Sequence, residues 1–136
     1  MKKILVLIVM ISSLAIAKPY TKEDRIYDMN EMAQAMNIIQ SGFFYNNYDT
    51  VEAGVSKLAD AIVRVKPPLE EVEEKDAMNR YMNKKIQMSN KIVKKINQKS
   101  LTILQRFKAG DPAQAVQAYT KIMGQCMKCH REMRNW

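Results

Sequence analysis

Apolar residues recur at alternating three- and four-residue steps along most of the chain, which is the periodicity of amphipathic helices. The first such segment runs from Lys22 to about Asn46. The second starts near Asp49 or Thr50, either of which can cap a helix, and ends at Pro67-Pro68. The apolar stripe of the first segment consists of Met29, Met32, Met36, Ile39 and Phe43, and that of the second of Val51, Val55, Leu58, Ile62 and Val65.

Two further helices are predicted in the C-terminal half. A long one begins in the acidic turn 70–74, which suits the positive end of a helix dipole, and continues to about Lys108. Its predicted inward positions are Met78, Met82, Val93, Ile96, Leu104 and Phe107. The Gly-Asp-Pro sequence at 110–112 then ends one helix and starts the next, which runs to about Met133. The predicted inward positions of this last helix are Val116, Tyr119, Ile122, Met123, Cys126 and His130.

These four segments set the fold class. Nothing in the sequence has the pattern of a strand, so the fold is predicted to be all-α. Four amphipathic helices with mostly short connections favour an antiparallel four-helix bundle. No acid/base pair, no nucleophile beside a base and no phosphate-binding loop is present, so the sequence predicts no enzyme.

The N-terminus has the organisation of a secretory signal peptide. Lys2 and Lys3 precede a run of apolar and small residues that ends in the Ala-Ile-Ala sequence at 15–17. The run from Ile4 to Ala17 is shorter than the roughly 20 apolar residues that a membrane span needs. We therefore expect cleavage after Ala17, a mature domain of residues 18–136, and export to the periplasm. No Cys directly follows the apolar run, which argues against a lipid anchor.

The chemistry of the chain is concentrated near its C-terminus. Residues 126–130 read Cys-Met-Lys-Cys-His, and Cys126, Cys129 and His130 are the only Cys and His residues in the sequence. Cys-x-x-Cys-His is the attachment sequence of c-type haem, in which the thiols bond to the two vinyl groups and the imidazole binds iron. On a helix, residues at these positions share one face. The sequence therefore predicts one covalent haem c.

The motif has three other interpretations. A zinc site needs four ligands, so an Asp or Glu would have to complete the set. A thioredoxin-like dithiol needs a βαβ context, and no strand is predicted. A structural disulfide between Cys126 and Cys129 fits an oxidising compartment but leaves His130 without a role.

With this motif on the last of four helices, the chain resembles the class II cytochromes c, the cytochrome c′ family. The resemblance covers the whole mature chain, although only the haem motif is specific. It implies that Cys126 and Cys129 carry the thioethers, that His130 is the proximal iron ligand, and that the first helix covers the other haem face. It also implies a basic residue near a haem propionate, four positions before the distal residue. Arg25 and Met29 have that spacing.

The distal ligand decides between two functions within this family. A Met that binds iron gives a low-spin electron carrier and raises the reduction potential. An apolar distal residue leaves a five-coordinate haem that binds nitric oxide or carbon monoxide. Met29 is the first choice as ligand and Met32 the second, whereas Met is also an ordinary filler of irregular cores. A haem-free helical periplasmic protein with a structural disulfide remains a third interpretation.

Charge and exposed apolar residues bear on the partners. The 22 Lys and Arg exceed the 14 Asp and Glu, and loss of Lys2 and Lys3 leaves a mature net charge near +6. This excess could steer the protein to an acidic redox partner or to an anionic membrane, and a solvated basic surface with no partner is the alternative interpretation. Export removes nucleic acid as a partner. Apolar residues on the first two helices could also form a homodimer interface, which the family often uses.

Overall fold

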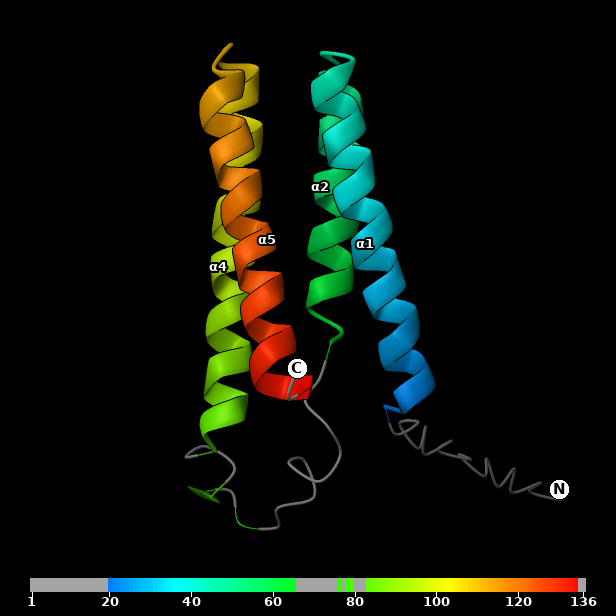
Figure 1. Ribbon diagram of the computed structural model, residues 1–136, viewed down its shortest axis with the longest axis vertical. Helices are drawn as coiled ribbons and strands as arrows, with labels where there is room; N and C mark the ends of the chain where they lie inside the picture. The colour runs from blue at the N-terminus through cyan, green and yellow to red at the C-terminus, as the bar shows by residue number, and fades with distance from the viewer. Residues whose placement is uncertain (1–19, 66–75, 77, 80–82, 135–136) are drawn as a thin grey trace, which may run out of the picture.

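The computed structural model describes residues 20–65, 76, 78–79 and 83–134. Within them lie four helices and no strand: α1 (Lys22–Phe44), α2 (Tyr48–Ile62), α4 (Lys84–Lys108) and α5 (Pro112–Arg134). Neighbouring helices run in opposite directions, with α1 beside α2 and α4 beside α5 (Figure 1). The predicted all-α four-helix bundle is confirmed. The predicted signal peptide lies outside the described residues.

Local polar contacts explain where the first hairpin begins and turns. The Thr21 hydroxyl accepts a hydrogen bond from the Asp24 N–H at 3.2 Å, and the Asp24 carboxylate accepts one from the Thr21 N–H at 2.9 Å, so α1 starts in a capping box. Asn46 adopts a positive φ of 48°, which turns the chain towards α2. The Asn47 side chain then accepts from the Thr50 N–H at 3.0 Å. Asn47 is therefore the N-cap, and the prediction of a cap at residue 49 or 50 is wrong.

The connection between α2 and α4 differs from the prediction. Helix α2 ends at Ile62, before Pro67-Pro68, and those prolines lie outside the described residues, as does the acidic turn 70–74. Helix α4 begins at Lys84. The preceding Asn83 has an extended backbone conformation, and its side chain accepts hydrogen bonds from the N–H groups of Lys85 and Ile86. The prediction of one continuous helix from the acidic turn to Lys108 is wrong, since Asn83 starts a new helix.

The connection between α4 and α5 follows the prediction. Gly110 has a φ of 76°, in the left-handed region that favours glycine. The Asp111 carboxylate accepts a hydrogen bond from the Gln114 N–H at 3.1 Å, and Pro112 is the first helical residue. Capping residues and proline thus set this boundary from local sequence alone.

The core contains most of the residues that the stripes predict. Its buried members are Met32, Ala35, Ile39, Val51, Val55, Leu58, Ala61, Ile62, Ile92, Ile96, Ile103, Ala118 and Ile122. Met78 and Val116 were predicted to face inward and are instead 65% and 43% exposed. On α5 the buried side chains before Ile122 are Ala115 and Ala118, whose small size lets α4 and α5 pack closely. Met82 lies outside the described residues.

Candidate functional site

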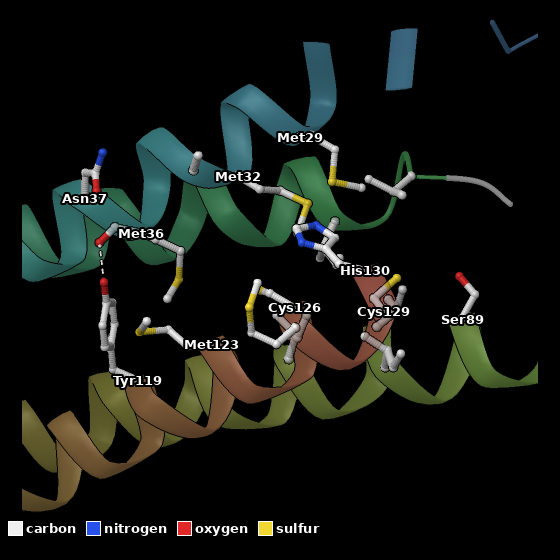
Figure 2. Close-up of a pocket in the computed structure, with 17 residues that line it drawn as sticks. Met29, Met32, Met36, Asn37, Ser89, Tyr119, Met123, Cys126, Cys129 and His130 are labelled. Carbon is white, nitrogen blue, oxygen red and sulfur yellow. Dashed lines mark hydrogen bonds between the residues drawn. The ribbon is translucent and has the colours of Figure 1, made fainter. Parts of the chain in front are cut away.

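A cavity of about 360 Å³ lies between the two hairpins. All four helices contribute to its wall, and most of the lining side chains are apolar or carry sulfur (Figure 2). The lining residues are Met29, Met32, Ala33, Met36, Asn37, Ile62, Val65, Ser89, Ile92, Val93, Ile96, Tyr119, Met123, Cys126, Met127, Cys129 and His130. Cofactor sites are usually apolar cavities of about 300–1,000 Å³ with a few polar groups, and this cavity has that size and character.

The three motif residues meet on the α5 side of the cavity. Cys126, Cys129 and His130 all line it, and each is partly buried. Their spacing of three and four residues places them on one stripe of α5, and this stripe faces the cavity. The imidazole of His130 points into the space between α5 and α1 (Figure 2). The structure therefore brings two thiols and one imidazole to a single wall.

Burial sets the charge state of one thiol. The pKa of Cys126 is raised, chiefly by its removal from water and further by the nearby Cys129 sulfur. A raised pKa keeps the thiol protonated at neutral pH, whereas the thiolate is the form that binds zinc. In the described part of the chain, no group of three or more His, Cys, Asp or Glu side chains could hold a metal ion. The two cysteines are not joined as a disulfide.

The opposite wall is formed by methionines of α1. Met29, Met32 and Met36 all line the cavity, Met32 being buried and the other two partly buried. In Figure 2 the side chains of Met29 and Met32 extend from α1 into the same space as His130. The two methionines that the sequence favours as ligands are thus both available, and their placement does not rank one above the other.

Arg25 lies close to this wall but does not line the cavity. It precedes Met29 by one turn of α1 and is partly buried. Its Nε is buried and has no hydrogen-bond partner in the described part of the chain. A buried guanidinium nitrogen without a partner fits a site that receives a carboxylate.

Aromatic side chains close the cavity at the end near Met36. The Tyr119 hydroxyl donates a hydrogen bond to the Met36 carbonyl at 3.3 Å and so joins α5 to α1 (Figure 2). The Phe43 ring packs against Tyr119 and Phe107, with ring centroids 5.7 Å and 5.4 Å away. Burial raises the pKa of Tyr119, so the hydroxyl stays protonated and able to donate.

Some lining residues were not predicted as part of the site. Met127 lies inside the Cys-x-x-Cys-His motif, four residues after Met123, and that helical spacing was an available signal for a shared face. Ser89 also lines the cavity, although the sequence only places it in a polar part of the α4 stripe. Nothing in the local sequence predicts that this serine faces α5.

No protein-family model, curated protein or solved structure matches the chain. None of the helices in the described residues is both long and apolar enough to cross a membrane. The site must therefore be interpreted from its own residues.

Proposed function

We propose that the protein is a periplasmic monohaem c-type cytochrome of the class II type that carries electrons. The observation that supports this proposal is the convergence of Cys126, Cys129 and His130 on a mostly apolar cavity, with methionines on the facing wall. The donor set fits haem c: two thiols and an imidazole at the attachment spacing on one side, and thioethers on the other.

Each residue has a distinct role in this proposal. Cys126 and Cys129 would hold the haem through thioether bonds, and His130 would be the proximal ligand. Met29 or Met32 would bind from the α1 side, and Arg25 would pair with a propionate. The aliphatic side chains of α2 and α4 would give the haem an apolar surface to pack against. When bound, the haem iron supplies a one-electron redox couple.

The attachment is tested by the mass of the mature protein. Exported from a host competent in haem maturation, it should exceed its polypeptide mass by one haem, and Cys126→Ala/Cys129→Ala should have the bare mass. Met127→Ala is the matched control, since it changes the same motif without removing a thiol, and it should keep the haem. A wild-type protein of bare polypeptide mass would leave the haem-free helical protein as the better interpretation.

A five-coordinate cytochrome that binds nitric oxide or carbon monoxide is the second candidate. Apart from Asn37, α1 presents only apolar side chains to the cavity: Met29, Met32, Ala33 and Met36. If none of the methionines binds iron, this wall is a pocket suited to a small gas molecule.

The spectrum of the reduced protein separates the two candidates. With Met29 as ligand, the protein should be low-spin and take up carbon monoxide slowly, and Met29→Ala should bind the gas rapidly and have a lower potential. Met32→Ala tests the ligand one turn along. Met123→Ala, which changes a cavity thioether of α5, should leave the spectrum unchanged. A native protein that is high-spin and binds carbon monoxide promptly would rule out a methionine ligand and favour the gas-binding function.

A further inference from the structure

The two hairpins carry opposite net charges. Helices α4 and α5 together contain twelve Lys and Arg and one Glu, a net charge of +11, and α4 has no acidic residue at all. Helices α1 and α2 contain three Lys and Arg and seven Asp and Glu, a net charge of −4. The overall excess of basic residues is therefore concentrated on the hairpin that carries the Cys-x-x-Cys-His motif. The acidic turn 70–74 lies outside the described residues and is not included in these totals.

Four lysines of α4 and two of α5, on helices that pack against each other, make up what we call the basic surface of this hairpin. Its members are Lys91, Lys94, Lys95, Lys99, Lys121 and Lys128. All are exposed except Lys99, which is partly buried, and none forms an ion pair within the part of the chain that the structure describes. On α4 the spacing of three and four residues places the first four on one side of the helix. The like charges of this side repel one another, so an acidic ligand would relieve an existing repulsion.

The lysines of α5 lie on a different side of the helix from the cavity. Lys121 and Lys128 continue the stripe of buried Ala118 and partly buried Gln125, whereas the cavity is lined by the stripe of Met123, Met127 and His130. A partner bound to Lys121 and Lys128 would therefore contact the helix that holds the motif without filling the cavity.

We propose that the basic surface of the α4–α5 hairpin is the docking site for an acidic patch on a redox partner protein. The inference deepens the proposed function and rests on it, because a docking site on α5 serves electron exchange only if α5 carries the haem. Complementary charge raises the rate of association more than the final affinity, which suits a carrier that must bind and leave repeatedly. Redox complexes of this kind have small interfaces, below about 1,200 Å².

The packing of the hairpin favours a protein over a membrane or a second copy. Helices that insert into a bilayer interface expose a continuous apolar face, but Ile92, Ile96, Ile103, Ala118 and Ile122 are buried in the core. The large apolar side chains left exposed on these helices are Leu101, Val116 and the cavity-lining Met123 and Met127. In a second copy, the α1–α2 hairpin would have to supply the acidic patch. Its Asp28 and Glu31 are already paired with Arg64 and Lys57, at 2.8 Å and 3.3 Å. Two of the seven carboxylates of this hairpin are therefore already neutralised by ion pairs, and its net charge of −4 is a weak complement to the +11 of α4 and α5.

A charge-reversal pair tests the location of the site. Lys95→Glu/Lys121→Glu changes one lysine of each helix in the basic surface. Lys22→Glu/Asn30→Glu/Gln40→Glu produces the same change in net charge at exposed positions of α1 and is the matched control. Flavodoxin, an acidic one-electron carrier, is the probe. Its association with each protein is measured by surface plasmon resonance over a salt series, and its rate of reduction of the oxidised haem by stopped flow.

The surface predicts a different result for the two variants. At low ionic strength the association rate constant and the reduction rate should each fall at least about tenfold for Lys95→Glu/Lys121→Glu and much less for the control. The salt dependence of the basic-surface variant should also be flatter. Equal decreases in the two variants would overturn the proposal, because net charge alone would then explain the binding. Vesicles rich in phosphatidylglycerol that bind the wild type, with flavodoxin rates equal in all three proteins, would overturn it in favour of a membrane.

The same experiment separates this proposal from the proposed function. Association with flavodoxin can be measured on a protein that lacks haem. A bare polypeptide mass would therefore reject the cytochrome, whereas a loaded protein that binds flavodoxin without regard to Lys95 and Lys121 would reject only the docking site.

Discussion

The two hairpins of the bundle are built on different principles. In α1–α2, two glycines bring the backbones together. A Cβ on Gly54 would lie 2.8 Å from the Ile39 nitrogen and 3.0 Å from the Ala35 oxygen, and one on Gly42 would lie 2.8 Å from the Val51 nitrogen. In α4–α5, a Cβ on Gly124 of α5 would meet no atom within 4 Å. The close approach of α1 and α2 thus depends on Gly42 and Gly54, whereas Gly124 of α5 is not at a helix contact.

The two hairpins also differ in whether their polar side chains have partners within the protein. Asp28 is buried in α1 and accepts hydrogen bonds from the Arg64 Nε at 2.8 Å and the Tyr20 hydroxyl at 2.9 Å. The six lysines of the basic surface form no ion pair within the described part of the chain, and all but Lys99 are exposed. The α1–α2 hairpin uses its polar groups to fix one packing arrangement, whereas the α4–α5 hairpin carries the thiols, the imidazole and the lysines to which we have assigned binding roles in our proposals. We therefore expect substitutions in the first hairpin to change stability and those in the second to change binding.

The largest stability effect is expected from Gly54→Ala. The added methyl group meets backbone atoms of α1, which cannot rotate away as a side chain can, so the two helices must separate. We expect a loss of roughly 3 kcal/mol in the free energy of unfolding. Thermal unfolding followed by circular dichroism should then show a melting temperature lower by on the order of 10 °C.

Gly124→Ala is the matched control on the other hairpin. Here the methyl group enters open space in the middle of a helix, so the change should stabilise the protein by up to about 1 kcal/mol through the helix propensity of Ala. Equal effects of the two substitutions would contradict the view that only the first hairpin depends on glycine for the close approach of its helices.

A smaller effect is expected from Asp28→Asn. The amide keeps the size of the side chain but removes the negative charge that faces Arg64. Because the Arg64 side chain is 45% exposed, water can replace part of the lost interaction. We expect a loss of about 2 kcal/mol, measured by urea unfolding, which is less than for a fully buried pair.

Glu31→Gln provides the comparison for this second prediction. The Lys57–Glu31 pair joins the same two helices but is more exposed, and its loss should cost less than about 1 kcal/mol. If both substitutions cost the same, burial of Asp28 would not be what makes its ion pair important.

The sequence predicts the helices well where local residues end them. The Gly-Asp-Pro sequence at 110–112 is a local signal, and the structure agrees with it. The Asn83 cap was missed because asparagine inside a charged, helix-favouring stretch gives only a weak signal for a boundary. The inward position of Asp28 was also not predicted. An aspartate on an apolar stripe is explained by its two partners, the Tyr20 hydroxyl and Arg64, and Arg64 lies 36 residues away.

The candidate site also has one part that the sequence predicts and one part that it does not. The positions of Cys126, Cys129 and His130 on one face follow from helical spacing within five residues. The facing wall depends on how α1 packs against α5, and that packing is set by contacts between residues distant in sequence. Periodicity could thus predict that Met29, Met32 and Met36 face inward. It could not predict that Tyr119 would bond to the Met36 carbonyl and close one end of the cavity.

The smallest effect is expected at this contact between the hairpins. Tyr119→Phe removes the hydrogen bond to Met36 and leaves the ring contact with Phe43 in place. A hydrogen bond of this kind contributes about 1 kcal/mol to stability.

Burial raises the pKa of Tyr119 above the value of the unfolded chain, so the folded state favours the neutral hydroxyl. The contribution is therefore fully present below about pH 10, the unfolded value, and is lost as the pH rises through the folded pKa. The wild type should exceed the variant by about 1 kcal/mol at pH 8, and the difference should shrink above pH 10. The other five of the six tyrosines are common to both proteins and cancel in this comparison. Tyr45→Phe, at a side chain exposed to solvent, should change stability by less than about 0.5 kcal/mol at pH 8. Urea unfolding from pH 7 to pH 11 measures the stability of the wild type, Tyr119→Phe and Tyr45→Phe. If the difference between the wild type and Tyr119→Phe stays constant across this range, the hydroxyl does not join the hairpins.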